Sequence, residues 1–363
     1  MARIEQASVA LYGLPLKRAW SDQTHEVSEI EIVIVRLTSD EGIVGDGFTW
    51  TAGVGGRAVK SLVESEIFPR LVGKEAAPRP RWHELWRALH DAGGGGVTTT
   101  ALGAVDIALW DLLGKQLGCS LTNMLGRWRE TVEAYASGID LNLTIEELEE
   151  EARRWVERGY EAVKIKVGSP SIEEDRRRVA TVRKTIGARP LMVDANQGWD
   201  VTGALRACRQ LEEFDLTWIE EPLVSDDTLG HARLRAASPV PIAVGENLYT
   251  VYDFNRYFAW GACDYAQPDV ARVGGITAFL DIAAVTSGWN VPLAPHFMME
   301  ITGQLLCCLP GAFLLEDVEG GSLSELGALK QRIAVQGGRF RPPEDPGHGI
   351  QFDFDAIGPF RKA

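Results

Sequence analysis

The sequence lacks the features that mark secreted and membrane-spanning proteins. Its opening stretch, MARIEQASVALYGLPLKR, has no apolar run long enough for a signal peptide, and no later segment approaches ~18 uncharged apolar residues. Its five cysteines are odd in number and scattered, without the pattern of a disulfide framework or the spacing of a zinc site. We therefore expect a cytoplasmic protein with reduced, structural cysteines and no membrane partner.

Positive charge is also scarce. Lys and Arg number 37 against 51 Asp and Glu, a net charge of −14, and no basic patch is concentrated anywhere. Such a protein repels a polyanionic backbone, which excludes nucleic acid as a partner. An acidic protein that handles an anionic small molecule must supply local positive charge from a metal or from clustered lysines.

What remains is typical of a globular protein of about two domains. The chain has 363 residues, of which 45% are hydrophobic, 24% are charged and 38 are glycines. Residues 28–38 alternate polar and apolar side chains and, with a second extended piece at 42–50, predict a hairpin, and residues 58–91 and 100–118 predict helices. The four glycines at 93–96 are not followed by Lys-Ser or Lys-Thr, so we interpret them as a connection rather than a phosphate-binding loop.

From residue 132 onward, short apolar strands alternate with helical stretches. The eight strands are VEAYASGI, EAVKIKVG, PLMVDANQG, LTWIEEPL, PIAVGENL, CDYAQPDV, VPLAPHF and AFLLEDVE. Strand alternating with helix predicts parallel βαβ units. Eight strands at steps of about 20 to 30 residues favour a closed (β/α)₈-type barrel over an open doubly wound sheet, and no GxGxxG follows the first strand.

Nearly every one of these strands ends in polar residues, where a parallel barrel has its active site. Asp194, Glu220 and Glu246 follow strands three, four and five, and both intervals are 26 residues, one βα unit each. Three converging carboxylates would repel one another unless a divalent cation lay between them. All-oxygen ligation favours Mg²⁺ over zinc.

Two further strand ends carry basic residues. Lys164 and Lys166 share one face of strand two, either as bases inside the barrel or as surface lysines whose heads reach solvent. At the end of strand seven, His296 can donate a hydrogen bond to Asp269 of strand six, which would orient the ring and raise the basicity of its other nitrogen. Lys164 beside Lys166 is expected to lower the pKa of the lysine pair.

Six ordered motifs resemble the enolase superfamily in its mandelate racemase branch. They are KIK at 164–166, VDANQGW, WIEEP, VGEN, QPD and PHFMMEI, accompanied by AVDIALWDLLGK and the PGHG tail. The resemblance implies an α/β fold: a modified (β/α)₇β barrel over residues 127–330 with an α+β capping domain. Residues 1–126 form that cap, and residues 331–363 return to it.

The resemblance also implies roles for individual residues. Asp194, Glu220 and Glu246 would bind one Mg²⁺ per subunit, Lys166 would be one base and His296 with Asp269 the other. Lys164 would contact the substrate carboxylate, Glu316 would be a hydrogen-bonding acid and Asn196 would hold a substrate hydroxyl. The branches with a lysine in place of Asp269, the muconate-lactonising enzymes and dipeptide epimerases, fit less well.

The chemistry implied is removal of the proton next to a carboxylate, through an enediolate. A 2-hydroxy carboxylate is the expected substrate, and with a hydroxyl on its β carbon the product is a 2-keto-3-deoxy acid. In the loops at 19–26 and 48–53, Trp20 and Trp50 would wall off solvent, and Asp22, His25, Thr49 and Thr51 would bind hydroxyls. With Lys17 and Arg18 nearby, this mixture favours a sugar acid, an aldonate or an aldarate.

Other functions fit parts of the pattern. Racemisation or epimerisation of a simpler 2-hydroxy acid is the first alternative, and a sugar-acid lactone cycloisomerase is the second. A non-catalytic binding barrel would be expected to have lost a base or a metal ligand, and no such group is lost. The resemblance implies a homo-oligomer, from dimer to octamer.

Overall fold

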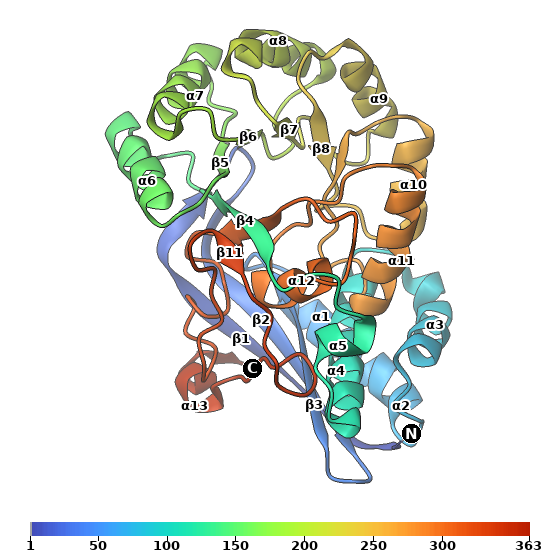
Figure 1. Ribbon diagram of the computed structural model, residues 1–363. Coiled ribbons are helices and arrows are strands. Elements are labelled where there is room, and N and C mark those ends of the chain that lie inside the picture. The colour runs from blue at the N-terminus through green and yellow to red at the C-terminus, as the bar shows by residue number, and fades with distance from the viewer. Residues whose placement is uncertain (1) are drawn as a thin grey trace.

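The structure, a computed structural model, describes residues 2–363 and divides its strands between two sheets. In Figure 1 a curved parallel sheet, green to yellow, is wrapped on its outside by helices, and the blue antiparallel strands lie beside it. The red C-terminal segment crosses back to the blue strands. The predicted combination of a barrel with an α+β cap is confirmed as the architecture.

The antiparallel sheet has the order β12-β1-β2-β3. Its strands are β1 (Ile4–Ser21), β2 (Glu26–Ser39), β3 (Val44–Thr51) and the short β12 (Arg361–Lys362). The β2–β3 pair is the predicted hairpin, whereas the long strand β1, which pairs along β2, was not anticipated. Alternation places Ile32 and Ile34 in a core cluster shared with the barrel, and Val33 and Val35 in a separate core with the helices of the cap.

Helices cover the outer face of this sheet. They are α1 (Gly56–Leu62), a π-helical turn (Val63–Ile67), α2 (Phe68–Leu71), α3 (Pro78–Leu89) and α4 (Val97–Leu117). The short α5 (Leu121–Leu125) follows α4, and its Leu121 packs in the core cluster on the barrel side. Helix α4 approaches β3 so closely that a Cβ on Gly47 would lie 2.2 Å from the carbonyl oxygen of Ala104. Helix α4 is long and apolar enough to span a membrane, but 89% of its apolar window is buried within the protein, which makes it a core helix.

The parallel strands form the barrel. They are β4 (Val132–Ser137), β5 (Val163–Lys166), β6 (Leu191–Asp194), β7 (Trp218–Glu220), β8 (Ile242–Val244), β9 (Tyr265–Ala266) and β10 (Leu315–Val318), paired in the order β10-β4-β5-β6-β7-β8-β9. The predicted seventh strand is reduced to single bridges from Leu293 to Ala266 and to Ala312, which continue the ring toward β10.

The outer helices follow the strands in turn. They are α6 (Ile145–Glu157), α7 (Ile172–Ile186), α8 (Val201–Leu211), α9 (Thr228–Ala237), α10 (Val251–Ala259), α11 (Ile276–Gly288) and α12 (Met299–Leu306). After β10 the chain adds β11 (Arg339–Phe340) antiparallel to β4, and then α13 (Phe354–Ile357) before β12 pairs with β1. The carboxyl ends of the barrel strands therefore meet at one mouth, beside the cap.

Candidate active site

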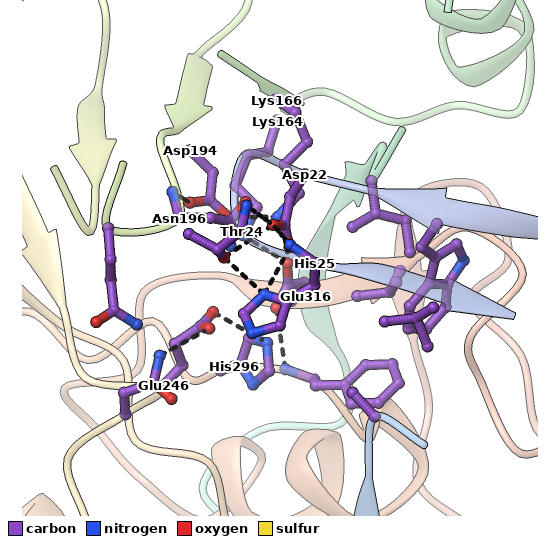
Figure 2. Close-up of a pocket in the computed structure, with 18 of the residues that line it drawn as sticks. Asp22, Thr24, His25, Lys164, Lys166, Asp194, Asn196, Glu246, His296 and Glu316 are labelled. Carbon is purple, nitrogen blue, oxygen red and sulfur yellow. Dashed lines mark hydrogen bonds and ion pairs between the residues drawn. The ribbon is translucent and has the colours of Figure 1, made fainter. Parts of the chain in front are cut away.

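A pocket at the barrel mouth gathers most of the side chains singled out by sequence (Figure 2). Its lining includes Trp20, His25, Trp50, Lys164, Lys166, Asp194, Asn196, Glu246, His296 and Glu316. Glu220 and Asp269 are not among the lining residues; both are fully buried and hydrogen-bond to side chains at the site. The pocket is therefore built jointly by the barrel strand ends and by β1, β2 and β3 of the cap.

The three predicted metal ligands converge on one point. Asp194 and Glu220 are the last residues of β6 and β7 and are paired in register, and Glu246 follows β8 by two residues. Asp194, Glu220 and Glu246 each offer a carboxylate oxygen within 4.8 Å of the others. Asp194 and Glu220 are buried, and the side chain of Glu246 is only 13% exposed.

Each of these carboxylates has one oxygen held by the surrounding protein. The donors are Asn196 N to Asp194 Oδ1 at 2.9 Å, Gln267 Nε2 and Trp218 Nε1 to Glu220 Oε2 at 2.6 and 3.1 Å, and Asn247 Nδ2 to Glu246 Oε1 at 3.1 Å. The second oxygens face basic groups: Lys166 Nζ lies 2.6 Å from Asp194 Oδ2, Lys164 Nζ 2.6 Å from Glu220 Oε1, and His296 Nε2 3.2 Å from Glu246 Oε2. Outer hydrogen bonds of this kind orient ligands toward a metal.

The electrostatics of the cluster suit a divalent cation. Burial, together with Asp194 and Glu316, raises the pKa of Glu220 to about 7 against the opposing effect of Lys164. Burial also raises the pKa of Asp194, but Lys166 and Lys164 outweigh it and the net shift is downward. A hard cation would relieve the repulsion among these oxygens, and an all-carboxylate set is one that Mg²⁺ accepts. The residues present therefore fit Mg²⁺.

Lys164 and Lys166 point into the barrel, so the alternative of a solvent-exposed strand is wrong. Their exposed fractions are 1% and 6%. Lys164 lies 2.7 Å from Glu316 as well as 2.6 Å from Glu220. Burial lowers the pKa of each lysine and Lys164 lowers that of Lys166 further, but the facing carboxylates outweigh these effects and both pKa values are raised. The expected net lowering of the pair is therefore not observed.

Glu316 is ionised in this arrangement. Burial raises its pKa, but Lys164 and then His296 lower it to about 2. The carboxylate accepts a hydrogen bond from Phe297 N at 3.0 Å and pairs with Lys164. Its expected role as a hydrogen-bonding acid needs a proton that this carboxylate does not hold here, and that role stays a prediction.

His296 and Asp269 come together as the sequence predicts. His296 Nδ1 lies 2.9 Å from Asp269 Oδ2, and Asp269 Oδ1 accepts backbone N–H groups of Ala271 and Arg272 at 2.8 and 3.2 Å. Burial lowers the pKa of His296, but Glu246 and the hydrogen bond to Asp269 outweigh it and raise the pKa. Phe297, next to the histidine, has φ 53°, a left-handed conformation that is strained for a bulky residue.

The predicted loop residues do not all lie at the pocket. Trp20, Asp22 and His25 line the pocket, with Asp22 Oδ1 accepting Thr24 N at 2.6 Å and His25 N at 2.7 Å. Thr49 and Thr51 do not line it: Thr49 Oγ1 donates to Ala271 O at 3.2 Å, and Thr51 Oγ1 to Glu31 Oε2 at 2.8 Å. Lys17 and Arg18 line a separate hollow, where Arg18 pairs with Asp140 at 2.7 Å. The expectation that these threonines bind substrate hydroxyls is therefore wrong. Lys17 and Arg18 lie outside this pocket, and the expectation of an aldonate or aldarate as substrate stays a prediction.

Sequence reasoning missed several polar residues here, of which Arg272 and Gln267 contact the predicted metal ligands. Arg272 lines the pocket and donates to Glu246 O at 3.1 Å, and Gln267 is buried and donates to Glu220. Both flank Asp269 in the segment QPDVAR, Gln267 two residues before it and Arg272 three after. Their closeness in sequence to Asp269, an aspartate at a strand end, could have identified them as site residues.

Comparison with known proteins agrees with this geometry. Residues 11–126 match the model described as the mandelate racemase / muconate lactonizing enzyme N-terminal domain, and residues 147–356 match the enolase C-terminal domain-like model. The 3,6-anhydro-alpha-L-galactonate cycloisomerase of Streptomyces coelicolor is 39% identical over 358 residues, 98% of each chain. The L-talarate/galactarate dehydratase of Salmonella typhimurium is 36% identical over 87% of this chain and 82% of its own.

Solved structures give the same result. The L-talarate dehydratase of Polaromonas sp. JS666, complexed with Mg and L-glucarate, superimposes with a TM-score of 0.92 at 36% identity, covering 100% of this chain and 98% of that one. Fold and site thus define an enolase-type barrel enzyme. The chain belongs to the enolase superfamily, in its mandelate racemase / muconate lactonizing enzyme family.

Proposed function

We propose that the protein is a Mg²⁺-dependent acid-sugar dehydratase that converts an aldonate or aldarate into a 2-keto-3-deoxy acid. The observation that carries this proposal is that two basic side chains, Lys166 of β5 and His296 after the Leu293 bridge, enter one pocket around the carboxylate cluster. One basic group can remove the proton from carbon 2, and the second, in its protonated form, can protonate the hydroxyl that leaves carbon 3.

In this proposal the metal ligands, the lysines and the histidine have different tasks. Asp194, Glu220 and Glu246 would hold Mg²⁺, which when bound supplies Lewis-acid stabilisation of the negative charge that develops on the substrate carboxylate. Lys164 contributes its positive charge at the same carboxylate. Lys166 or His296 takes the α-proton, and protonated His296 gives a proton to the leaving hydroxyl, so that one water is lost.

The relatives support dehydration as the first candidate reaction and cycloisomerisation as the second. The Salmonella and Polaromonas relatives are dehydratases, and the Streptomyces relative, 39% identical over nearly the whole chain, is a cycloisomerase. We therefore retain cycloisomerisation of a sugar-acid derivative as the second candidate. We also propose a cytoplasmic location, in keeping with the free state of all five cysteines in residues 2–363, and, from the family resemblance, a homo-oligomeric state.

The test separates the two bases. Each variant is incubated with Mg²⁺ and both carbon-2 epimers of candidate sugar acids in deuterated water, and the α-proton is followed by NMR. His296→Asn should abolish dehydration but still exchange the α-proton of the epimer that faces Lys166. Lys166→Met should exchange the α-proton only of the other epimer, which faces His296.

Two outcomes contradict the proposal. If both variants lose exchange of the same epimer, the bases do not lie on opposite sides of the substrate. If the wild-type protein neither exchanges the α-proton nor forms a 2-keto acid with any acid of a sugar-acid library, the dehydratase assignment fails.

A further inference from the structure

We infer that Trp50, which belongs to the cap, is a positioning residue for His296 and acts through Asp269. Trp50 is the penultimate residue of β3, and its indole Nε1 donates a hydrogen bond of 3.0 Å to Asp269 Oδ2. The same oxygen lies 2.9 Å from His296 Nδ1. The inference rests on the proposed function, because it assigns His296 the part of a base.

Asp269 has no freedom to reorient in this network. Its side chain is fully buried, Oδ1 accepts backbone N–H groups of Ala271 and Arg272, and Oδ2 is shared by the indole and the imidazole. A buried, fully satisfied network fixes the direction of each acceptor. His296 is thereby held with a donating Nδ1, which leaves Nε2 as the nitrogen that exchanges protons.

Trp50 is itself held in place from several sides. The guanidinium of Arg272 lies 4.4 Å from the centroid of its ring, and the ring of Phe297 packs edge-on at 4.6 Å. Arg272 is fixed in turn by donating to Glu246 O at 3.1 Å and to Asn247 Oδ1 at 3.0 Å. The indole N–H is therefore pre-oriented toward Asp269 rather than free to bind substrate.

This arrangement gives the cap a second task. The sequence assigned Trp50 to closing the pocket, and it does line the pocket, with 5% of its surface exposed. Its hydrogen bond also connects two segments 219 residues apart, so docking of the cap sheet on the barrel sets the orientation of the Asp269–His296 pair. Lys166, whose partner is Asp194, has no such connection to Trp50 among the contacts of residues 2–363.

The test removes the indole N–H and keeps an aromatic ring. Trp50→Phe should lower kcat for dehydration, and α-proton exchange of the His296-facing epimer, by about 10- to 100-fold, the range for loss of a hydrogen bond to a charged group. Exchange of the Lys166-facing epimer should change less than about three-fold, and KM should change little, because a lost positioning contact appears in kcat.

Trp110→Phe is the matched control. Trp110 lies on α4, is 8% exposed, and donates its indole N–H to Thr277 Oγ1 of α11 at 3.0 Å, away from the pocket. The Trp110→Phe variant should exchange the α-proton of both epimers at the wild-type rate. Equal effects of Trp50→Phe and Trp110→Phe, or equal losses for both epimers in Trp50→Phe, would overturn the inference while leaving the proposed function standing.

A spectroscopic measurement tests the hydrogen bond without turnover. In a ¹⁵N-tryptophan-labelled protein, the indole resonance that disappears in Trp50→Phe, or in Trp50→Tyr if that variant folds better, belongs to Trp50. Asp269→Asn should move this resonance upfield and leave that of Trp110 in place. An unmoved Trp50 resonance overturns the inference, and a wild type without any α-proton exchange overturns both it and the proposed function.

Discussion

Binding of Mg²⁺ to the carboxylate cluster should raise the melting temperature. The size of the increase follows from the chain length and from the Mg²⁺ concentration relative to its Kd. Unfolding entropy is about 2.1 cal/mol/K per residue, so 363 residues correspond to about 0.8 kcal/mol/K at the midpoint. A ligand present at 100 times its Kd stabilises the folded state by about 2.7 kcal/mol. The expected increase is therefore about 3 to 4 °C.

Two buried glutamates make a matched pair for this experiment. Glu220 and Glu300 are both fully buried, and burial is the largest cause that raises the pKa of each to about 7. Glu220 belongs to the cluster with Asp194 and Glu246, whereas Glu300 lies on α12 and accepts a hydrogen bond from Ser324 N. Glu220→Gln replaces a charged ligand oxygen by a neutral amide and should abolish the shift, and Glu300→Gln should retain it.

The assay is thermal unfolding followed by circular dichroism, with Mg²⁺ or with a chelator, for the wild type and both variants. Mg²⁺ titration of each protein at one temperature supplies the Kd that the calculation requires. The reasoning is refuted if Glu220→Gln keeps the wild-type shift, or if Glu300→Gln loses it as completely as Glu220→Gln does.

Three further predictions concern other parts of the chain. Lys164→Met should reduce dehydration and exchange of both epimers by about 10²- to 10³-fold, because its buried charge serves either direction; loss for one epimer alone would contradict this. His25→Ala should change kcat/KM unevenly across a sugar-acid library, and a uniform decrease would assign the residue to the chemistry instead. Burial raises the pKa of Asp106 from 3.8 to about 7, so the folded protein retains a proton that the unfolded chain releases, and stability should fall by up to about 4 kcal/mol between about pH 4 and pH 7. Glu220 and Glu300, whose pKa values burial also raises to about 7, contribute to the same slope, so Asp106→Asn should reduce it by the share of Asp106, up to about 4 kcal/mol, as measured by urea unfolding on either side of that range.

The barrel and its strand-end residues were predictable because both follow from local pattern. Short apolar strands at regular spacing require parallel packing, and parallel packing brings Asp194 and Glu220, 26 residues apart, into register at one edge. The fold was less predictable where strands are short. β9 has only two residues, and the predicted seventh strand is a pair of bridges, so neither could be delimited by alternation of side chains.

The contribution of the cap to the site could not be predicted from sequence spacing. Thr49, Trp50 and Thr51 are adjacent, and only the docking of β3 against the barrel decides which of them reaches the catalytic side chains. Alternation along a strand separates Trp50 from its two neighbours but does not state which face meets the barrel. The three side chains were therefore interpreted together as pocket residues, and two of the three assignments are wrong.

The charge balance of the site connects its lysines to the acidic character of the chain. Asp194, Glu220, Glu246 and Glu316, when ionised, carry four negative charges, and Lys164 and Lys166 supply two positive ones, which leaves −2. A divalent cation neutralises that remainder, whereas lysines alone would do so only if two more of them were buried, each at a desolvation cost. The substrate carboxylate then enters a nearly neutral site inside a protein of net charge −14, where Lys164 and a protonated His296 can meet the second negative charge that forms during the reaction. With a single lysine in the apolar strand β5, the same count would leave −1 after the divalent cation, so we attribute the second lysine to this charge balance.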